Sequence, residues 1–284
     1  MPLSTTFERS CEHWSAERSE EMQDFYALAW VDYQHLAQAR DWVAWFSALQ
    51  QEAGERPLEL LDVACGSGKF PAALRRDTSL MRTSKVDAIR YSLLDPSPFS
   101  IAQARVQLAP PFHLADEFVT TLQGLEAVAG RFDVVWATHA LYAIPPDELK
   151  QALQRLLEVT RGVGFIAHSN AAGHYIRCYE HYLQALRPGE DLAPYTTAEQ
   201  IVATLEDLGV SCSCEDLTYS NGTDQTGLAE GYLQRCVFDG EITLAQMLAS
   251  EPLGDYLRSC REAGRWCFPQ SVKMISFDLR GHPA

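Results

Sequence analysis

Residues 62–69, Asp-Val-Ala-Cys-Gly-Ser-Gly-Lys, form the segment of this sequence that is best suited to bind a ligand. Gly66 and Gly68 follow a short apolar run at residues 58–65, and glycines two positions apart let the chain turn tightly and let a ligand approach the backbone. Such a run is typical of a buried parallel strand. In open α/β sheets ligands bind at the carboxyl ends of the strands, so this turn predicts a ligand site at a strand-to-helix junction.

Two common nucleotide-binding patterns do not fit the turn. A dinucleotide fingerprint requires a third glycine three residues after Gly68, and that position is Pro71. A P-loop requires Gly-Lys followed by Ser or Thr, with a further glycine five residues before the second one. Lys69 does follow Gly68, but Phe70 comes next and Val63 occupies the position of the earlier glycine. Both nucleotide-binding patterns are therefore rejected.

The pattern that remains is an acidic residue, three residues, and then Gly-x-Gly, at Asp62, Gly66 and Gly68. A second carboxylate, Asp95, ends the next strand-like run, 29 residues after Gly66. A carboxylate has two acceptor oxygens and suits the two neighbouring hydroxyls of a ribose. Together with the strand-like run Phe-Asp-Val-Val-Trp-Ala at residues 132–137, these features resemble the class I methyltransferases, which use S-adenosylmethionine.

The resemblance implies a cofactor site around the glycine turn. In that family the glycine loop lies under the amino-acid part of S-adenosylmethionine, and the carboxylate after the second strand accepts the ribose hydroxyls. The residues that the resemblance assigns to cofactor binding are Asp62, Ala64, Gly66, Ser67, Gly68, Asp95, Pro96, Ser100 and Thr138.

A longer resemblance covers residues 60–279, where the order of segments is similar to the histamine N-methyltransferase family, small-molecule enzymes of this class. It is carried by Leu-Asp-Pro-Ser at residues 94–97, Leu141-Tyr142, residues 191–209, Phe238 and the closing run at residues 272–279. The resemblance implies a small-molecule substrate. It also implies that Tyr195 and Phe238 are aromatic residues of the substrate pocket.

The chain departs from that family at several pocket positions. His139 stands where the family has a glutamine after the fourth strand, and His174 and Cys178 stand where it has two tryptophans. The family's substrate-binding glutamate in the N-terminal helices has no clear counterpart here, since Asp32, Gln34 and Gln38 are merely nearby. The pocket is therefore expected in the same place with different chemistry.

His139 is the candidate catalytic residue, because acceptors approach the methyl group at this position in the class, and a histidine can orient a substrate or take its proton. The predicted reaction is N-methylation of a small amine or imidazole-type metabolite. Two alternatives remain open: O- or C-methylation of a small hydroxylated or carboxylated metabolite, and cofactor binding without methyl transfer. The candidate substrate-binding residues are His139, Tyr142, His174, Tyr195 and Phe238.

The elements that must position these residues alternate between strand-like and helical patterns. Alternation of this kind predicts an α/β fold with a mostly parallel sheet covered on both faces. With the resemblance, we expect a Rossmann-like, doubly wound, seven-stranded sheet whose last strand is antiparallel. The chain is expected to form a single methyltransferase domain, residues 1–284, with an N-terminal helical lid (1–50), a cofactor-binding core (58–220 and 270–280) and a helical insertion (223–268) that caps the substrate.

Composition narrows the function further. The formal net charge of −15, without a large cluster of Lys and Arg, argues against nucleic acid as a partner. No apolar run is long enough to span a membrane, and the N-terminus lacks the pattern of a secretory signal. Eight scattered cysteines indicate a reduced, cytoplasmic chain. No residues with metal-ligand spacing are found, so we expect activity without a metal ion. We also expect a monomer or weak dimer.

Overall fold

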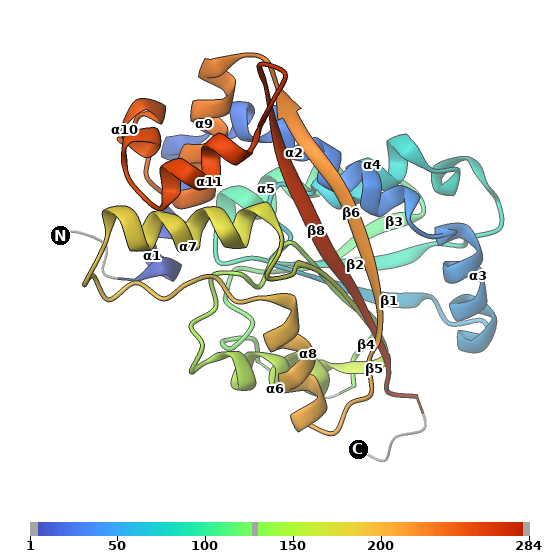
Figure 1. The fold of residues 1–284 in the computed structure, drawn as a ribbon. Coiled ribbons are helices and arrows are strands. Elements are labelled where there is room, and N and C mark those ends of the chain that lie inside the picture. The colour runs from blue at the N-terminus through green and yellow to red at the C-terminus, as the bar shows by residue number, and fades with distance from the viewer. Residues whose placement is uncertain (1–4, 127–129, 281–284) are drawn as a thin grey trace.

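The computed structural model describes residues 5–126 and 130–280. Within these ranges eight strands form one sheet with the order β3-β2-β1-β4-β5-β8-β6, and β7 pairs with β8 at its margin (Figure 1). The strands are β1 (Leu58–Val63), β2 (Ile89–Leu94), β3 (Phe112–Phe118), β4 (Phe132–Thr138), β5 (Thr160–Ser169), β6 (Ser213–Thr223), β7 (Arg261–Glu262) and β8 (Arg265–Asp278).

The sheet has the predicted Rossmann-like pattern. Strands β1 to β5 pair in parallel, whereas β8 lies antiparallel between β5 and β6. The chain builds outward from β1 to β3 on one side and resumes with β4 on the other side of β1. Ligands bind in open sheets at such a change of direction, because the loops after the two strands diverge there and leave a crevice.

The last two strands that pair, β6 and β8, are long, and β8 begins at Arg265, well before the closing run at residues 272–279 that the sequence showed. They pair from Ser213 with Ser276 to Thr223 with Trp266. The polar stretch Ser-Asn-Gly-Thr at residues 220–223 and Pro269 concealed these parts of the two strands in the sequence. The ladder that they form runs to the end of the molecule where helices α9 to α11 lie (Figure 1).

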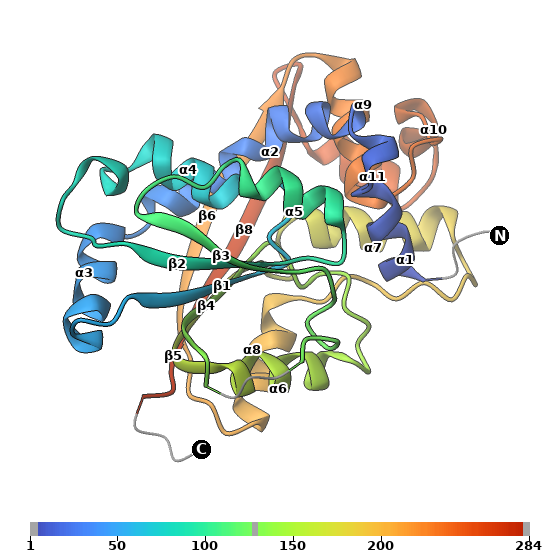
Figure 2. The same cartoon turned by 180° about the vertical axis from the view of Figure 1, so that it is seen from behind.

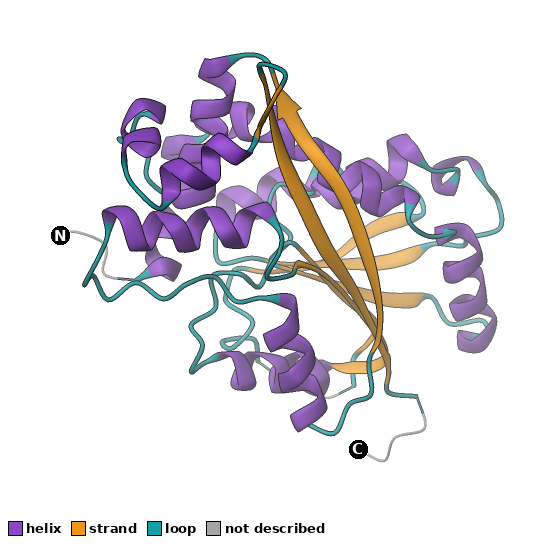
Figure 3. Cartoon of the chain, in the orientation of Figure 1, coloured by secondary structure: helices purple, strands orange, loops and turns teal. Residues whose placement is uncertain are grey.

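Helices cover both faces of the sheet (Figures 2 and 3). Alternate residues of each strand point to opposite faces, so a strand contributes to two cores. Leu60 and Trp136 pack with residues of α3, α4 and α5 on one face, and Leu61 and Val135 pack with α6 and α8 on the other. The helices of the core layers are α3 (Trp42–Ala53), α4 (Lys69–Asp77), α5 (Pro98–Arg105), α6 (Leu149–Val159) and α8 (Ala198–Asp207).

A third apolar cluster forms a helical cap at one end of the sheet. It joins side chains of α2, α7 and α9 to α11 with Trp266 and Phe268 of β8. Of the segment 1–50, α2 reaches this cap, whereas Trp42 and Phe46 of α3 belong to the core under the sheet. The cap helices are α1 (Thr6–His13), α2 (Glu21–Gln38), α7 (His174–Leu186), α9 (Thr226–Val237), α10 (Leu244–Ala249) and α11 (Leu253–Ser259), and short 3-10 turns occur at Ala16–Arg18 and Leu80–Arg82. No helix among the described residues is long and apolar enough to cross a membrane.

Candidate active site

A cavity of about 420 Å³ lies between the carboxyl ends of the parallel strands and the helical cap. Small-molecule sites commonly measure about 300–1,000 Å³, so the cavity has the size of a ligand pocket. Its wall includes residues at the ends of β1, β2 and β4 and side chains from α1, α2, α7 and α9. All the predicted site residues line it except Gly68 and His174.

The two glycines of the turn have different surroundings. Gly66 has a φ of +51°, and a Cβ added there would have no atom within 4 Å, so its backbone is open to a ligand. Gly68 has a φ of +70°, and a Cβ there would lie 2.8 Å from the Cα atom of Ala104 in α5. Gly68 therefore allows α4 and α5 to pack closely. Gly68 is not among the residues that line the cavity, and its cofactor contact stays a prediction.

Asp95 connects the second strand to the glycine loop. Its Oδ2 atom accepts a hydrogen bond from the backbone N–H of Gly66 at 3.0 Å, and Oδ1 accepts one from Ser97 N–H at 2.8 Å. Burial raises the pKa of the Asp95 carboxyl, although these two hydrogen bonds oppose the shift. A carboxylate has about four lone-pair positions, so two remain for the hydroxyls of a ribose. The open loop and this carboxylate fit the cofactor that the sequence predicts.

Asp62 lies deeper, under the glycine loop. Its Oδ2 atom accepts a hydrogen bond of 2.6 Å from the hydroxyl of Tyr91, and the residue is buried at the end of β1. Burial raises the pKa of Asp62 to about 7. The side chain still contributes to the cavity wall, so it can both support the loop and face a polar ligand group.

His139 occupies a strained position directly after β4. Its φ is +53°, which is unfavourable for a residue with a Cβ, and its N–H donates to the carbonyl of Ala167 at 2.8 Å. Among the described residues, Nε2 has no hydrogen-bond partner. Burial lowers the pKa of His139 to about 3, so the imidazole is neutral at physiological pH. The structure thus places an unpaired neutral imidazole in the cavity wall.

Three predicted aromatic residues from distant segments meet in the cavity. The ring centroids of Tyr142 and Tyr195 are 5.3 Å apart, those of Tyr195 and Phe238 are 5.6 Å apart, and those of Tyr142 and Phe238 are 6.0 Å apart. The backbone supports this cluster, because Thr196 N–H donates to the carbonyl of Tyr142 at 2.9 Å. The cluster forms one aromatic wall.

His174 does not join this wall and does not line the cavity, and its substrate contact stays a prediction. Its Nδ1 atom lies 2.8 Å from the hydroxyl of Tyr256 in α11, and its ring centroid is 4.6 Å from that of Phe268 in β8. The next two residues of α7, Tyr175 and Ile176, line the cavity in its place. The turn of the helix directs His174 into the cap core and the following residues toward the ligand space.

Sequence reasoning missed a set of wall residues from the N-terminal helices, the start of α4 and α9. Lys69 ends the glycine-rich segment, but the sequence assigned it no role, and nothing in the sequence marked Arg235. Trp14 and Tyr26 have ring centroids 5.9 Å apart, and Lys69 Nζ lies 4.3 Å from the ring centroid of Tyr26. The missed wall residues include Trp14, Phe25, Tyr26, Asp32, Tyr33, Lys69, Tyr175 and Arg235.

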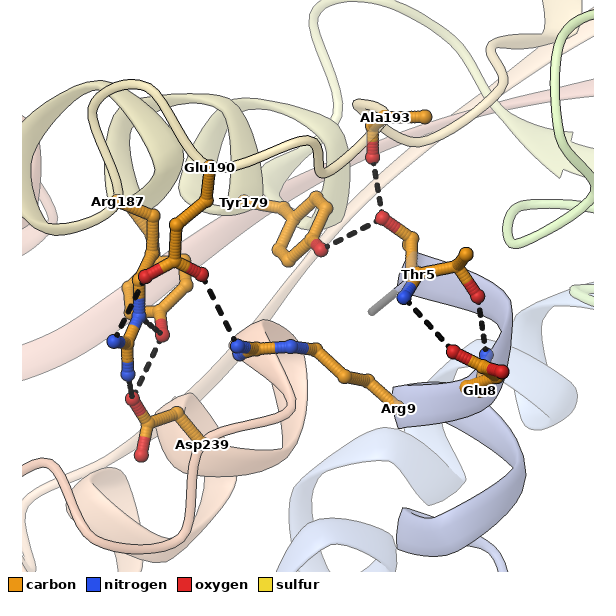
Figure 4. A network of polar contacts seen from close by, with 10 residues as sticks. Thr5, Glu8, Arg9, Tyr179, Arg187, Glu190, Ala193 and Asp239 are labelled. Carbon is orange, nitrogen blue, oxygen red and sulfur yellow. Dashed lines mark hydrogen bonds and ion pairs between the residues drawn. The ribbon is translucent and has the colours of Figure 1, made fainter. Parts of the chain in front are cut away.

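Helix α1 closes one side of the cavity and is held from both ends. A capping box at Thr5 and Glu8 begins the helix, and Arg9 pairs with Glu190 at 3.3 Å (Figure 4). At its other end Trp14 Nε1 donates to the hydroxyl of Tyr142 at 2.8 Å. Figure 4 also shows Glu190 within the network that includes Arg187 and Asp239. These contacts place α1 over the aromatic wall.

The described part of the chain has no group of three or more His, Cys, Asp or Glu residues arranged to hold a metal ion. The polar groups of the cavity are instead single carboxylates, histidines and cations set among aromatic rings. This arrangement can hold a cofactor and a small molecule side by side.

Comparisons with known proteins concern the fold and the domain that hold this site. Residues 60–164 match a family model described as "Methyltransferase domain". No curated protein matches the sequence. Magnesium protoporphyrin IX methyltransferase from Synechocystis PCC 6803, solved with bound SAH, matches with a TM-score of 0.54 and 14% identity over 95% of this chain and 99% of that one. A suspected methyltransferase from Bacillus halodurans C-125 matches with a TM-score of 0.52 and 16% identity over 83% of this chain and 98% of that one.

At these identities the structural matches establish the fold. The family model identifies the segment that carries the glycine loop, Asp95 and His139 as a methyltransferase domain. The cofactor of this fold and domain is S-adenosylmethionine, whose demethylated product is S-adenosylhomocysteine. The chain is therefore an enzyme with a class I S-adenosylmethionine-dependent methyltransferase domain.

Proposed function

We propose that this methyltransferase transfers the methyl group to a nitrogen atom of a small amine or imidazole-type metabolite. The observation that carries the proposal is a buried carboxylate, Asp32, in the wall of a largely aromatic cavity. The resemblance to the histamine N-methyltransferase family, stated above from the sequence, points in the same direction.

Asp32 lacks a cationic partner among the described residues. It is 3% exposed, accepts a hydrogen bond of 2.5 Å from the hydroxyl of Tyr175, and accepts one of 3.0 Å from Asn221 Nδ2. A buried carboxylate without a cation is unfavourable, and an ammonium group of a ligand would supply the missing charge. Burial raises the pKa of Asp32 to about 6, so the carboxylate is mostly charged at neutral pH.

Aromatic rings complete a site for a flat or cationic molecule. Phe25 lies 5.4 Å from Trp14 and 5.3 Å from Tyr26, measured between ring centroids, and all three line the cavity. An ammonium group over such a ring gains about 0.5–2 kcal/mol. A nitrogen heterocycle can stack on the same surfaces.

His139 can orient the acceptor nitrogen. The bound cofactor supplies a methyl group on a sulfonium, and the protein has to align the acceptor with it and exclude water. The acceptor nitrogen needs a free lone pair, so a protonated amine first has to lose a proton, to the Asp32 carboxylate or to solvent. The neutral imidazole of His139 can then accept a hydrogen bond from the N–H of the neutral acceptor and direct the nitrogen lone pair away from itself. Because the pKa of His139 is lowered to about 3, the residue does not repel a cationic substrate.

The test measures transfer of labelled methyl groups to a panel of amines, imidazoles, phenols and carboxylic acids. We expect label on nitrogen compounds. Asp32→Asn should raise KM for the best amine by about 10–100-fold, the scale for losing a charged hydrogen bond. His139→Ala should lower kcat by about 100-fold if the histidine orients the nitrogen or takes its proton.

Asp147→Asn is the matched control, because Asp147 is an exposed carboxylate outside the cavity wall. It should leave KM and kcat unchanged. Because Asp32 becomes protonated as pH falls through about 6, KM for the amine should rise in that range in the wild type and not in Asp32→Asn. Label found on phenols or carboxylic acids alone would refute nitrogen transfer and favour the O-methylation alternative.

A further inference from the structure

A second buried charge, Arg235 of α9, also contributes to the cavity wall. Its side chain is 1% exposed, and its guanidinium carbon lies 5.1 Å from the ring centroid of Trp14. Nη1 donates to the backbone carbonyl of His13 and to His13 Nδ1, and Nη2 donates to the carbonyl of Arg18 at 2.9 Å. These contacts join α9 to the last residue of α1 and to the 3-10 turn that follows it.

The positive charge of Arg235 is poorly balanced. The nearest carboxylate oxygen among the described residues is Glu21 Oε2 at 3.9 Å, on a side chain that is 50% exposed and also pairs with Arg18 at 3.4 Å. His13 does not compensate, because burial and the neighbouring arginines lower its pKa to about 3 and leave it neutral. A buried cation without a close anion is unfavourable, which indicates a site for an anionic ligand group.

Arg235 also has unused hydrogen-bond donors. A guanidinium has five N–H groups, and the contacts to His13 and Arg18 occupy three of them. Nε has no partner among the described residues, and one N–H of Nη2 remains. Two N–H groups on one guanidinium suit the two oxygens of a carboxylate.

Arg235 of α9 lies beside the start of α2, whereas Asp32 lies further along α2. Glu21, which lies beside Arg235, precedes Asp32 by eleven residues, about 16 Å along a helix that rises 1.5 Å per residue. Phe25 and Tyr26 line the cavity between them. Near the glycine loop the cavity has another cation, Lys69, which is the first residue of α4 and can serve the amino-acid part of the cofactor.

We propose that Arg235 binds a carboxylate of the methyl acceptor. Building on the function proposed above, the acceptor is then an elongated zwitterion. Its nitrogen lies toward Asp32 and His139, its carboxylate lies at Arg235, and its body contacts the rings of Trp14 and Phe25.

Calorimetry tests the proposal. The complex of the protein with S-adenosylhomocysteine is titrated with phenylacetate and, separately, with its neutral amide, phenylacetamide. We expect wild-type protein to bind phenylacetate at least about tenfold more tightly than the amide, the scale of a charged hydrogen bond. Arg235→Met should abolish this preference. Arg235→Lys keeps the positive charge but not the planar guanidinium, so it should retain part of the preference for phenylacetate. This variant tests the proposal even if Arg235→Met does not fold.

Arg177→Met is the matched control, because Arg177 also stacks on an aromatic ring, 4.7 Å from the centroid of Tyr256, but does not line the cavity. It should keep the full preference for phenylacetate. Equal binding of the two compounds by wild-type protein would overturn the proposal. Loss of affinity for S-adenosylhomocysteine in Arg235→Met, with the preference intact, would also overturn it and assign Arg235 to the cofactor's carboxylate. The measurement involves no methyl transfer, so its outcome is independent of whether an amine is methylated.

Discussion

The backbone N–H of Gly66 donates a hydrogen bond of 3.0 Å to Oδ2 of Asp95, so the glycine loop and the end of the second strand form one unit. The bond holds the loop at a fixed distance from the carboxylate that is expected to bind the ribose. A cofactor that reaches both residues therefore meets a preorganised site, because the loop does not have to be ordered at the moment of binding.

Asp95→Ala should weaken binding of S-adenosylhomocysteine by about 1.5–3 kcal/mol, since it removes hydrogen bonds to a charged acceptor and frees the loop. Calorimetry measures the affinity, and circular dichroism checks that the variant is folded. Asp147→Ala, at an exposed position outside the cavity wall, is the control. Unchanged affinity in a folded Asp95→Ala protein would show that the ribose binds elsewhere.

The two glycines of the loop should respond differently to substitution by alanine. Gly68→Ala places a Cβ 2.8 Å from the backbone of Ala104, and we expect it to lower the free energy of unfolding by about 2–4 kcal/mol. Gly66→Ala meets no neighbour within 4 Å and should cost only about 1–2 kcal/mol of backbone strain while reducing cofactor affinity. Denaturant unfolding together with calorimetry separates the two effects. Equal losses of stability would contradict this division of roles.

His174 should make stability depend on pH. Burial lowers its pKa to about 3, whereas an unfolded histidine titrates near 6.5. Between these values the unfolded chain binds a proton that the folded chain excludes, so this contribution to stability falls as pH drops below 6.5. In His174→Gln the slope of unfolding free energy against pH, between pH 4 and 6, should be smaller by up to about 1.4 kcal/mol per unit. His113→Gln, at an exposed position, is the control, and identical slopes for wild type and His174→Gln would refute the prediction.

Asp133 anchors the start of β4 to its neighbours. Its carboxylate accepts hydrogen bonds from Arg56 Nη1 at 2.5 Å, Arg161 Nε at 2.7 Å and the backbone N–H of Glu59 at 2.9 Å. Burial would raise the pKa of Asp133, but these hydrogen bonds outweigh it and hold the pKa well below its ordinary value. The stabilisation is therefore present at neutral pH and is lost as pH falls below about 4.

Asp133→Asn should lower the free energy of unfolding at pH 7 by about 1–2 kcal/mol, a figure reduced for the partial exposure of the two arginines. Asp255→Asn is the matched control, because Asp255 pairs with Arg258 at 2.6 Å but its side chain is 78% exposed. It should leave stability unchanged within the error of the measurement, because an exposed ion pair is screened by solvent. Chemical unfolding of both variants makes the comparison, and equal effects would mean that burial adds nothing to the Asp133 network.

The sequence alone determined the elements whose signals are local. The apolar runs that became β1, β2 and β4, the glycine turn and the carboxylate at Asp95 could be predicted, because strand burial, positive φ and a strand-end acidic group leave patterns within a few residues. The mostly parallel sheet followed from the alternation of strands and helices.

The tertiary structure decided which side chains share the cavity. Whether a helical residue faces a ligand or a neighbouring helix depends on how the helix packs, which is why His174 points toward Tyr256 while Tyr175 lines the cavity. Asp32 and Arg235 carry no local signal, because each becomes unusual only when folding buries its charge without a matching partner. Gly68 likewise could be separated from Gly66 only by the approach of Ala104, since close contacts between segments distant in sequence exist only after the layers have packed.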